Sequence, residues 1–292
     1  MLLVNHPIVT KTRNVSESLT SNNYEHACGV YLSNEYNSGE YEGNVFKVEG
    51  GSNSTVSDIK VNDKFYIECK MPNAQAGQFV VNDTGSGFEF SSMNRDASLA
   101  NSKDVKKIIQ YMTDNYQTYS NPGSRGVSIP PFDDKELFAN CIATHNSDKN
   151  VKYVMTSEKG NLSNYIIFPS NAENLLHYFN ITAKYRVKRS GSHRVPKSKV
   201  DDVLAGIRQK YNDASLNEDG TVTIQDVDFK FDRIELNDNM TVMLRKIGDN
   251  VYTMRLRSNT ANANVIFSLS KNDNPQQPKD LDAFKKELNK KK

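Results

Sequence analysis

The chain has 292 residues, a formal net charge of +2 and 37% apolar residues, which is enough for one large domain or two ordinary ones. The small net charge excludes a bulk polycation, so local basic patches must meet any polyanionic partner. No apolar run approaches the roughly 18 residues of a membrane helix, and the run before His6 and Pro7 is too short for a signal peptide. The three cysteines are widely spaced, which argues against a disulfide frame. We therefore expect a cytoplasmic protein with no membrane partner.

The N-terminal half predicts helices and short strands after a polar start at residues 1–24. Helices are expected where apolar residues recur at helical spacing, in segments 24–36, 103–116 and 133–144. Alternation of apolar and polar residues predicts strands at 44–49 and twice within 55–70, whereas 75–81 fits either structure. We assign residues 1–150 to one core.

The C-terminal half is richer in predicted strands. Alternating or short apolar runs predict them at 151–156, 163–168, 182–189, 221–235, 240–247, 250–258 and 262–270. Helices are expected over 172–180, with Asn171 as the cap, and from Pro196 to about Tyr211. We assign residues 151–271 to a β-rich region, which can equally be part of one domain with the core, and residues 272–292 to a polar linker with a lysine-rich tail. The predicted fold class is α/β, in the α+β sense, with a mixed central sheet and flanking helices.

Residues 55–70 predict a β-hairpin, because two alternating apolar runs flank a short polar turn. With the turn centred on Asp63, Ile59 faces Ile67 and Asp58 faces Glu68. Side chains alternate across a strand, so one face of the hairpin is apolar. That face holds Ile59, Val61, Phe65, Ile67 and Cys69. The opposite face holds Asp58, Lys60, Tyr66, Glu68 and Lys70.

Opposed carboxylates destabilise a sheet, and a divalent metal would offset that cost. Hard oxygen ligands suit Mg²⁺, and a carboxylate-held Mg²⁺ serves phosphodiester hydrolysis by neutralising the phosphate and activating water. Asp58 and Glu68 supply two such ligands, and the backbone carbonyl of Cys69 can add a third. Lys70, on the same face, is within reach of the phosphate or the water. The five histidines form no metal-spaced pair, so zinc is not expected.

The sequence Ser57-Asp58, followed by nine residues and then Glu68-Cys69-Lys70, resembles the PD-(D/E)xK nuclease pattern. Ser57 stands where that pattern has proline, and the short spacing suits a tight hairpin. The continuation to Val81 is similar to one found in some type II restriction endonucleases. The specific resemblance covers residues 55–81. It implies a restriction-endonuclease-like core in which Asp58 and Glu68 hold metal and Lys70 orients or activates the water.

The resemblance further implies Mg²⁺-dependent, sequence-specific cleavage of double-stranded DNA by a type II restriction endonuclease of a restriction system. A palindromic site would call for a homodimer, because operator symmetry mirrors protein symmetry. One alternative is another nuclease of the same superfamily, for repair or structure-specific cutting. The other is a DNA-binding protein without catalysis.

Glu25 is a candidate third acid, because in this superfamily a helical carboxylate ahead of the core strands often approaches the metal. Glu42 and Glu49 are rivals for that role, and a plain surface glutamate is the other interpretation. Gln78 can contact the attacking water or DNA, or it can cap a local element.

Residues 184–199 form the densest basic segment, with no acid among them. Lysine and arginine can meet phosphates, and arginine can also read guanine in the major groove. The predicted DNA contacts here are Arg186, Lys188, Arg189, Ser190, His193, Arg194 and Lys197. The alternative is a solvated basic strand, turn and helix start.

A second candidate DNA segment is 254–264. Arg255 and Arg257 share one face of a predicted strand, and the amide of Asn259 suits an adenine edge. The alternative is an exposed strand followed by a polar turn.

Overall fold

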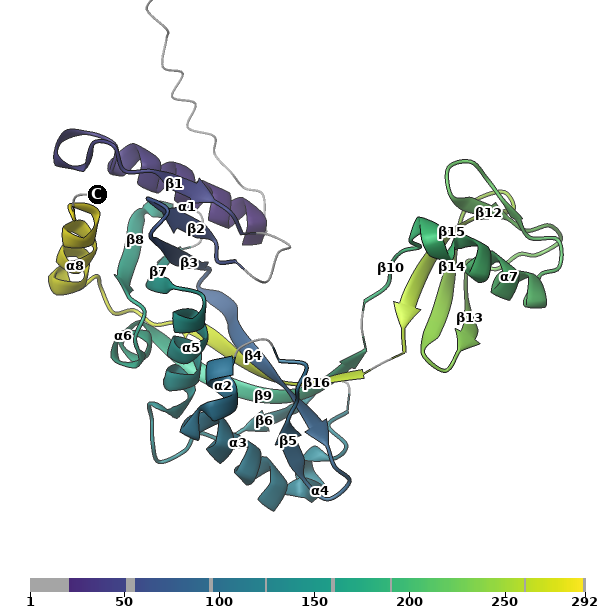
Figure 1. The fold of residues 1–292 in the computed structure, drawn as a ribbon, viewed down its shortest axis with the longest axis horizontal. Helices are drawn as coiled ribbons and strands as arrows, with labels where there is room; N and C mark the ends of the chain where they lie inside the picture. Colours follow the sequence, from purple (N-terminus) through teal and green to yellow (C-terminus); the bar gives the residue numbers. More distant parts are fainter. Residues whose placement is uncertain are drawn as a thin grey trace, which may run out of the picture.

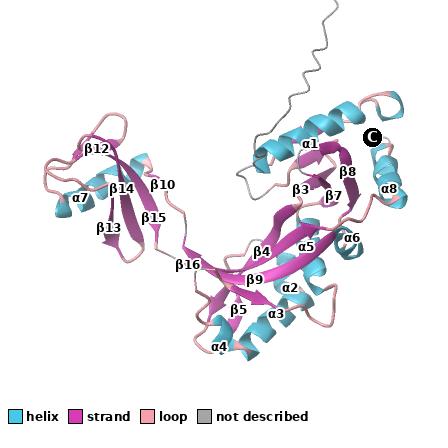
Figure 2. Ribbon diagram, turned by 180° about the vertical axis from the view of Figure 1, so that it is seen from behind, coloured by secondary structure: helices cyan, strands magenta, loops and turns pink. Residues whose placement is uncertain are grey.

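The structure, a computed structural model, describes residues 21–50, 56–94, 97–123, 125–158, 161–189, 191–259 and 261–290. Three β-sheets organise this part of the chain (Figure 1). Two of them lie together with most of the helices, while the third stands apart with helix α7, as the opposite views of Figures 1 and 2 both show. No helix in the described ranges is long and apolar enough to cross a membrane. The fold is a mixed α/β fold, which confirms the predicted class.

The first sheet has the strand order β1-β2-β3-β7-β8. Its strands are β1 (Phe46–Val48), β2 (Ile59–Val61), β3 (Phe65–Lys70), β7 (Val151–Glu158) and β8 (Asn161–Pro169). All neighbouring pairs are antiparallel except β3 and β7, which run parallel. The predicted hairpin is therefore present as β2 and β3, in the middle of a sheet that also contains strands from beyond residue 150.

One face of this sheet is covered by helices from the two ends of the described chain, α1 (Ser21–Glu35) and α8 (Pro278–Leu288). Cys28 and Leu32 of α1 and Phe284 of α8 are fully buried there, against the apolar face of the hairpin. Each fully buried apolar side chain of this size contributes about 1.5–3 kcal/mol. The lysine-rich end of the chain, for which a short helix or a tail is predicted, is a packed helix over Pro278–Leu288, because Phe284 and Leu288 join this core.

The second sheet has the order β5-β4-β16-β9-β6. Its strands are β4 (Asn73–Asp83), β5 (Phe88–Phe90), β6 (Val127–Ile129), β9 (Phe179–Arg189) and β16 (Ala261–Lys271). Helices α2 (Ala97–Asn101), α3 (Lys103–Asp114), α4 (Tyr116–Tyr119), α5 (Leu137–Asp148) and α6 (Ala172–Tyr178) lie beside it (Figure 1). The ambiguous segment 75–81 is a strand, β4, and it follows β3 after only two residues.

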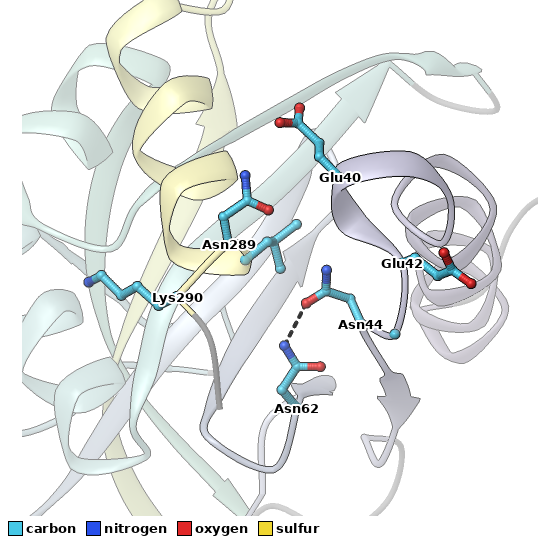
Figure 3. A pocket seen from close by; sticks show the side chains of 8 residues that line it. Glu40, Glu42, Asn44, Asn62, Asn289 and Lys290 are labelled. Atoms are coloured by element: carbon cyan, nitrogen blue, oxygen red, sulfur yellow. Dashed lines mark hydrogen bonds between the residues drawn. The ribbon is translucent and has the colours of Figure 1, made fainter.

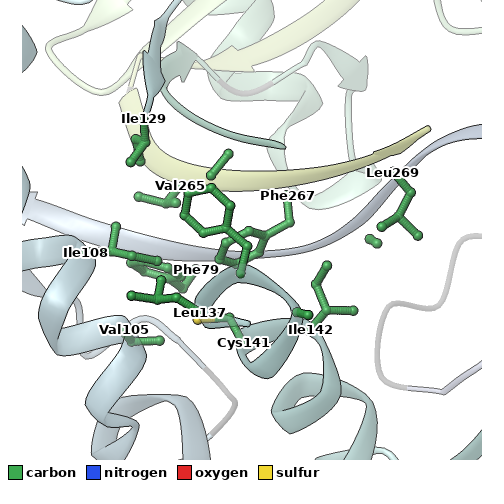
Figure 4. Close-up of a cluster of buried hydrophobic side chains, with 14 of the residues drawn as sticks. Phe79, Val105, Ile108, Ile129, Leu137, Cys141, Ile142, Val265, Phe267 and Leu269 are labelled. Carbon is green, nitrogen blue, oxygen red and sulfur yellow. The ribbon is translucent and has the colours of Figure 1, made fainter. Parts of the chain in front are cut away.

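The inner face of the second sheet packs on α3 and α5 (Figure 4). Phe79 and Val265 come from the sheet, Ile108 from α3 and Leu137 from α5, and all four are buried. Helix α3 follows its predicted stripe, while α5 begins four residues later than the predicted start at 133. The cap of α6 is also confirmed, since Asn171 Oδ1 accepts from the Asn174 amide over 2.9 Å.

The third sheet has the order β11-β12-β15-β14-β13, with β10 paired to β15. Its strands are β10 (His193–Arg194), β11 (Ser215–Leu216), β12 (Thr221–Thr223), β13 (Phe231–Asn237), β14 (Met240–Gly248) and β15 (Val251–Ser258). Helix α7 (Val200–Lys210) covers its inner face through a separate core that contains Val203, Ile207 and Leu244. The strand predicted over 221–235 is two strands, β12 and β13, with 224–230 between them outside the sheet.

The predicted boundary after residue 150 falls between α5 and β7, and strands from both sides of it share sheets. Strand β3 pairs with β7, and β4 pairs with β16. The unit with its own sheet and its own core lies within 191–259 instead. The shared sheets favour the predicted alternative of one domain with the core over most of 151–271, and the reason is physical: β7, β8, β9 and β16 bury apolar residues in the same cores as helices of the first half.

Candidate active site and nucleic-acid interface

The β2–β3 turn has the geometry that its sequence predicts. Asn62 and Asp63 adopt positive φ angles of 52° and 56°, and the Lys64 amide donates to the Val61 carbonyl over 2.9 Å. Asparagine and aspartate tolerate this conformation better than other side-chain-bearing residues. The observed register pairs Val61 with Phe65 and Ile59 with Ile67, which confirms the predicted alignment.

The two faces of the hairpin are also as predicted. Ile59, Phe65 and Ile67 are at most 1% exposed and belong to the core below α1. On the opposite face, Lys70 Nζ lies 2.5 Å from Glu68 Oε1, and both side chains are 16% exposed. Asp58 Oδ2 accepts from the Cys69 amide over 2.7 Å. Two carboxylates and one ammonium are therefore gathered at one edge of the first sheet.

The Cys69 carbonyl also faces this group. The N–H and C=O of one strand residue point to the same neighbouring side, and the Cys69 N–H points to Asp58. Strand β2 begins only at Ile59, so no β2 residue stands opposite Cys69 on that side. The backbone oxygen predicted as a metal ligand is thus directed towards the carboxylates.

Glu25 reaches the site from helix α1. Glu25 Oε2 and Asp58 Oδ1 lie 2.7 and 2.8 Å from the point where a Cβ on Gly50 would stand. The absence of a side chain at Gly50 therefore leaves a small space that two carboxylates from distant segments border. This places the candidate third acid beside Asp58.

The rivals of Glu25 have other partners. Glu49 Oε2 accepts from the Tyr66 hydroxyl over 3.0 Å, and Glu49 Oε1 lies 3.9 Å from Lys60 Nζ. Glu42 lines a separate cavity of about 550 Å³ with Glu40, Asn44 and Asn289 (Figure 3). Both rivals thus have surroundings of their own, whereas Glu25 lies against Asp58 at Gly50.

Burial and nearby charges perturb the protonation of all three hairpin groups. Desolvation and the charge of Glu68 raise the pKa of Asp58 to about 7, although Lys70 and the Cys69 amide act in the opposite direction. Burial also acts to raise the pKa of Glu68, but the charge and hydrogen bond of Lys70 outweigh it and hold that pKa below its usual value. Burial acts to lower the pKa of Lys70, yet the two carboxylates raise it overall. Lys70 is therefore an ammonium, and Asp58 is a carboxyl that a second cation would keep ionised.

Sequence reasoning missed two neighbours of this group. The charge of Lys149, at the end of α5, lowers the pKa of Glu68, as does the Ser57 hydroxyl. Thr156 of β7 stands next to Lys70 in the parallel β3–β7 register. No local pattern could identify them as neighbours, because the pairing of β3 with β7 joins segments more than 80 residues apart.

The donor set fits a hard divalent cation. Within the described ranges, no three His, Cys, Asp or Glu side chains already stand as a metal cluster. Magnesium, however, is commonly held by only one or two carboxylates and keeps several waters. The carboxylates of Asp58 and Glu25 border one small space, and the Cys69 carbonyl faces Asp58, so the oxygen ligands for such an ion are present.

The outer face of the second sheet brings together predicted DNA contacts from two segments. The ladder places Gln78 of β4 beside Ile266 of β16, and Ile266 beside Lys184 of β9. Arg186 and Lys188 follow on the same face of β9, because Ala183 and Tyr185 point into the core. A cavity of about 560 Å³ on this face is lined by polar side chains that include Gln75, Lys184 and Arg186 and by apolar residues that include Pro130 and Ile266.

Arg186 is the unusual member of this face. Its Nε is buried and has no hydrogen-bond partner among the described residues, which is a costly state for a cationic group. Arg189 ends β9, and Ser190 lies outside the described residues. Gln78 is exposed, and its Oε1 accepts from Gln75 Nε2 over 3.2 Å.

The remaining predicted contacts lie within 191–259, in or next to the third sheet. His193 and Arg194 form β10, and Lys197 begins a short 3-10 helix. Arg255 and Arg257 share the face of β15 opposite to its buried residues, as predicted. Arg255 also donates to the Ser192 carbonyl over 2.6 Å. Sequence reasoning missed two further arginines on this face, Arg233 and Arg245. Arg233 of β13 pairs with Met243 of β14, and Met243 pairs with Arg255. Arg245 pairs with Thr253, which lies on the same face of β15 as Arg255.

The side-chain amide of Asn259 is hydrogen-bonded within the protein. Its Oδ1 accepts from the Thr241 hydroxyl over 2.7 Å, and its Nδ2 donates to the Asp238 carbonyl over 3.3 Å. These bonds hold the β13–β14 turn against the end of β15. The amide that the sequence offered for reading adenine is therefore occupied in this structure.

The hairpin, its sheet and the second sheet define a restriction-endonuclease-like fold. Among solved structures, the chain is similar to HhaI endonuclease in complex with DNA, with a TM-score of 0.70 and 31% sequence identity over 92% of this chain and 99% of that one. The chain belongs to the family of HhaI endonuclease, a type II restriction enzyme. No family model and no curated protein matches it.

Proposed function

We propose that this protein is a Mg²⁺-dependent type II restriction endonuclease of the PD-(D/E)xK type, which hydrolyses double-stranded DNA at a defined sequence. The observation that carries the proposal is the joint position of Asp58, Glu68 and Lys70 on one face of the β2–β3 hairpin, with Glu25 against Asp58. The HhaI family membership supports the same activity.

The residues divide the chemistry among themselves. Asp58, Glu68 and the Cys69 carbonyl would hold the cation, with Glu25 as a further oxygen ligand, directly or through water. A divalent cation in such a site neutralises charge on the phosphate and makes water a better nucleophile. Lys70 stays protonated beside the two carboxylates, so its role is to orient the water and to stabilise the negative charge that develops on the phosphate.

Recognition would come from the outer face of the second sheet. That face follows the catalytic strand directly, because β3 ends at Lys70 and β4 begins at Asn73. Gln78, Arg186 and Lys188 project from it. The Arg186 Nε is buried without a partner among the described residues, and the side chain can gain one by turning towards a base or phosphate. His193, Arg194, Lys197, Arg255 and Arg257 would add phosphate contacts from the third sheet.

The predicted homodimer remains a prediction. Among the described residues, one chain carries one Asp58–Glu68–Lys70 set, so cutting both strands requires a second copy or a second event. Light scattering of the protein on a DNA duplex that carries its site would decide between them. A complex of one chain per duplex that still cuts both strands would contradict the dimer.

Plasmid digestion tests the proposed function. In Mg²⁺, the wild-type protein should produce discrete fragments with fixed ends, and Lys70→Ala should lower the cleavage rate by at least about 100-fold, as expected for loss of a group acting on the reacting atoms. Lys64→Ala, in the exposed turn of the same hairpin, is the matched control. Unchanged cleavage by Lys70→Ala would refute the catalytic assignment, and fragments with random ends would refute a restriction activity.

A further inference from the structure

Thr156 of β7 is a buried polar residue without a visible structural reason. It is 0% exposed, and its Oγ1 has no hydrogen-bond partner among the residues that the structure describes. A buried hydroxyl normally has a partner, and an isosteric valine would avoid the cost of leaving it without one. We therefore expect the Thr156 hydroxyl to gain a hydrogen-bond partner when the site binds its cation.

The sheet register places one polar side chain beside Thr156 on a neighbouring strand. Thr156 pairs with Lys70 of β3 on one side and with Ile166 of β8 on the other. Residues paired across neighbouring strands project to the same face, and the alternate residues Tyr153 and Met155 are buried on the opposite face below α1. Neighbouring strands are about 4.8 Å apart. The Thr156 side chain thus stands beside that of Lys70, and its partner on the other neighbouring strand is the apolar Ile166.

The Lys70 ammonium has more donors than the hairpin satisfies. It carries three N–H groups, and the hydrogen bond seen for it goes to Glu68 Oε1. Glu68 is also a proposed cation ligand, so its oxygens would be shared once an ion is held. The ammonium then needs a second acceptor that keeps it pointed at the reacting phosphate and water.

We propose that the Thr156 hydroxyl is this acceptor, and that Thr156 is a positioning residue for Lys70. This inference rests on the proposed function, because it assigns Thr156 a task in the same reaction. Thr156 does not touch the DNA or the water in this account. It holds the lysine that does.

Three variants separate this role from packing. Thr156→Val keeps the shape and removes the hydroxyl, Thr156→Ser keeps the hydroxyl, and Thr223→Val makes the same change in β12 of the third sheet. We expect Thr156→Val to lower the single-turnover cleavage rate in Mg²⁺ about 10-fold, the low end of the effect of a positioned group. Its affinity for the same DNA, its Tm and the activity of Thr223→Val should be unchanged. Thr156→Ser should cut within about twofold of wild type.

A second measurement needs no turnover. With Mg²⁺ present and DNA absent, acylation of the Lys70 amine by a small reagent, followed by mass spectrometry, reports how firmly the amine is held, with Lys64 as the internal reference. Thr156→Val should label Lys70 faster than wild type by about twofold or more, and Thr156→Ser should label it at the wild-type rate, as expected if one hydrogen bond is lost or kept.

The outcomes distinguish the two levels of the argument. If Lys70→Ala cuts like wild type, the proposed function fails and this inference fails with it. If Lys70→Ala is inactive but Thr156→Val cuts at the wild-type rate, or if Thr156→Ser is as slow as Thr156→Val, only the positioning role of Thr156 is refuted.

Discussion

The Cys69 amide donates to Asp58 Oδ2 over 2.7 Å, and this one bond orders the candidate active site. It fixes the Asp58 carboxylate just before the start of β2, beside the Glu68–Lys70 ion pair. It also turns the Cys69 carbonyl to the same side. A backbone bond from a rigid central strand positions a ligand more exactly than a loop could.

Asp58 should make the metal-free protein less stable as the pH rises. Its pKa is about 7 in the folded protein and about 3.9 in an unfolded chain, so the folded state binds the proton more tightly. The resulting stability is fully present below about pH 4 and is lost as the pH rises through 7. Asp58→Asn should therefore raise the free energy of unfolding at pH 8 by about 1–3 kcal/mol and leave it unchanged at pH 4.

Urea titrations at the two pH values with a chelator present would measure this effect. The matched control is Asp63→Asn in the turn of the same hairpin, where Lys47 and Lys60 lower the pKa of an exposed carboxylate. Asp63→Asn should give no gain at pH 8. A stability of Asp58→Asn that parallels wild type at both pH values would show that the Asp58 pKa is close to normal.

Protons should compete with the metal at the same carboxyl. Because Asp58 must lose its proton to hold a cation, apparent Mg²⁺ affinity should fall about tenfold per pH unit below pH 7 and level off above it. The measurement is the Mg²⁺ concentration for half-maximal cleavage at several pH values, with DNA affinity measured in parallel. A half-maximal concentration that stays constant from pH 5.5 to 7 would contradict the assignment of Asp58 as a ligand.

Gly50 should be essential for the site although it carries no chemistry. A Cβ there would stand within 3 Å of Glu25 Oε2 and Asp58 Oδ1, where it would displace both carboxylates. We expect Gly50→Ala to raise the half-maximal Mg²⁺ concentration at least about tenfold, comparable to the loss of a supporting partner at a metal site. Gly191→Ala is the matched control, since nothing lies within 4 Å of its added Cβ. Equal metal titrations for the two variants would mean that Glu25 and Asp58 do not act together.

The choice of third acid can be decided by charge-neutral substitutions. Glu25→Gln should weaken Mg²⁺-dependent cleavage, because Glu25 borders Asp58, whereas Glu42→Gln should have no effect, because Glu42 lines another cavity. Glu49→Gln should change stability slightly through Tyr66 and Lys60, but not the metal titration. A larger metal effect from Glu49→Gln than from Glu25→Gln would reverse the assignment.

The hairpin was predictable from the sequence because its information is local. Alternation and the turn residues fix which side chains of residues 58–70 share a face, and the structure keeps that arrangement. Glu25 near Asp58 depends on how α1 packs, and Thr156 beside Lys70 depends on a parallel pairing across a helical crossover, which periodicity does not specify. The separation of 191–259 from the rest was hidden for the same reason. Strands β9 and β16 alternate like the strands of the third sheet, and their pattern does not say which strand they pair with.

The second sheet and the third sheet should contribute differently to DNA binding. Lys188, exposed on β9, has the geometry of a phosphate contact, so Lys188→Ala should weaken binding to all sequences and reduce the slope of log affinity against log salt by about 0.9.

Arg186→Ala should instead reduce the free-energy difference between cognate and non-cognate DNA binding by about 1–3 kcal/mol, because the buried Arg186 Nε lacks a partner among the described residues. Asn259→Ala should lower stability and leave discrimination intact, because its amide already holds the β13–β14 turn. The affinities of the Lys188, Arg186 and Asn259 variants are measured by fluorescence titration of cognate and scrambled duplexes at several salt concentrations. Lys106→Ala, at an exposed position of α3, is the control. If Asn259→Ala lost discrimination and Arg186→Ala did not, sequence reading would belong to the third sheet.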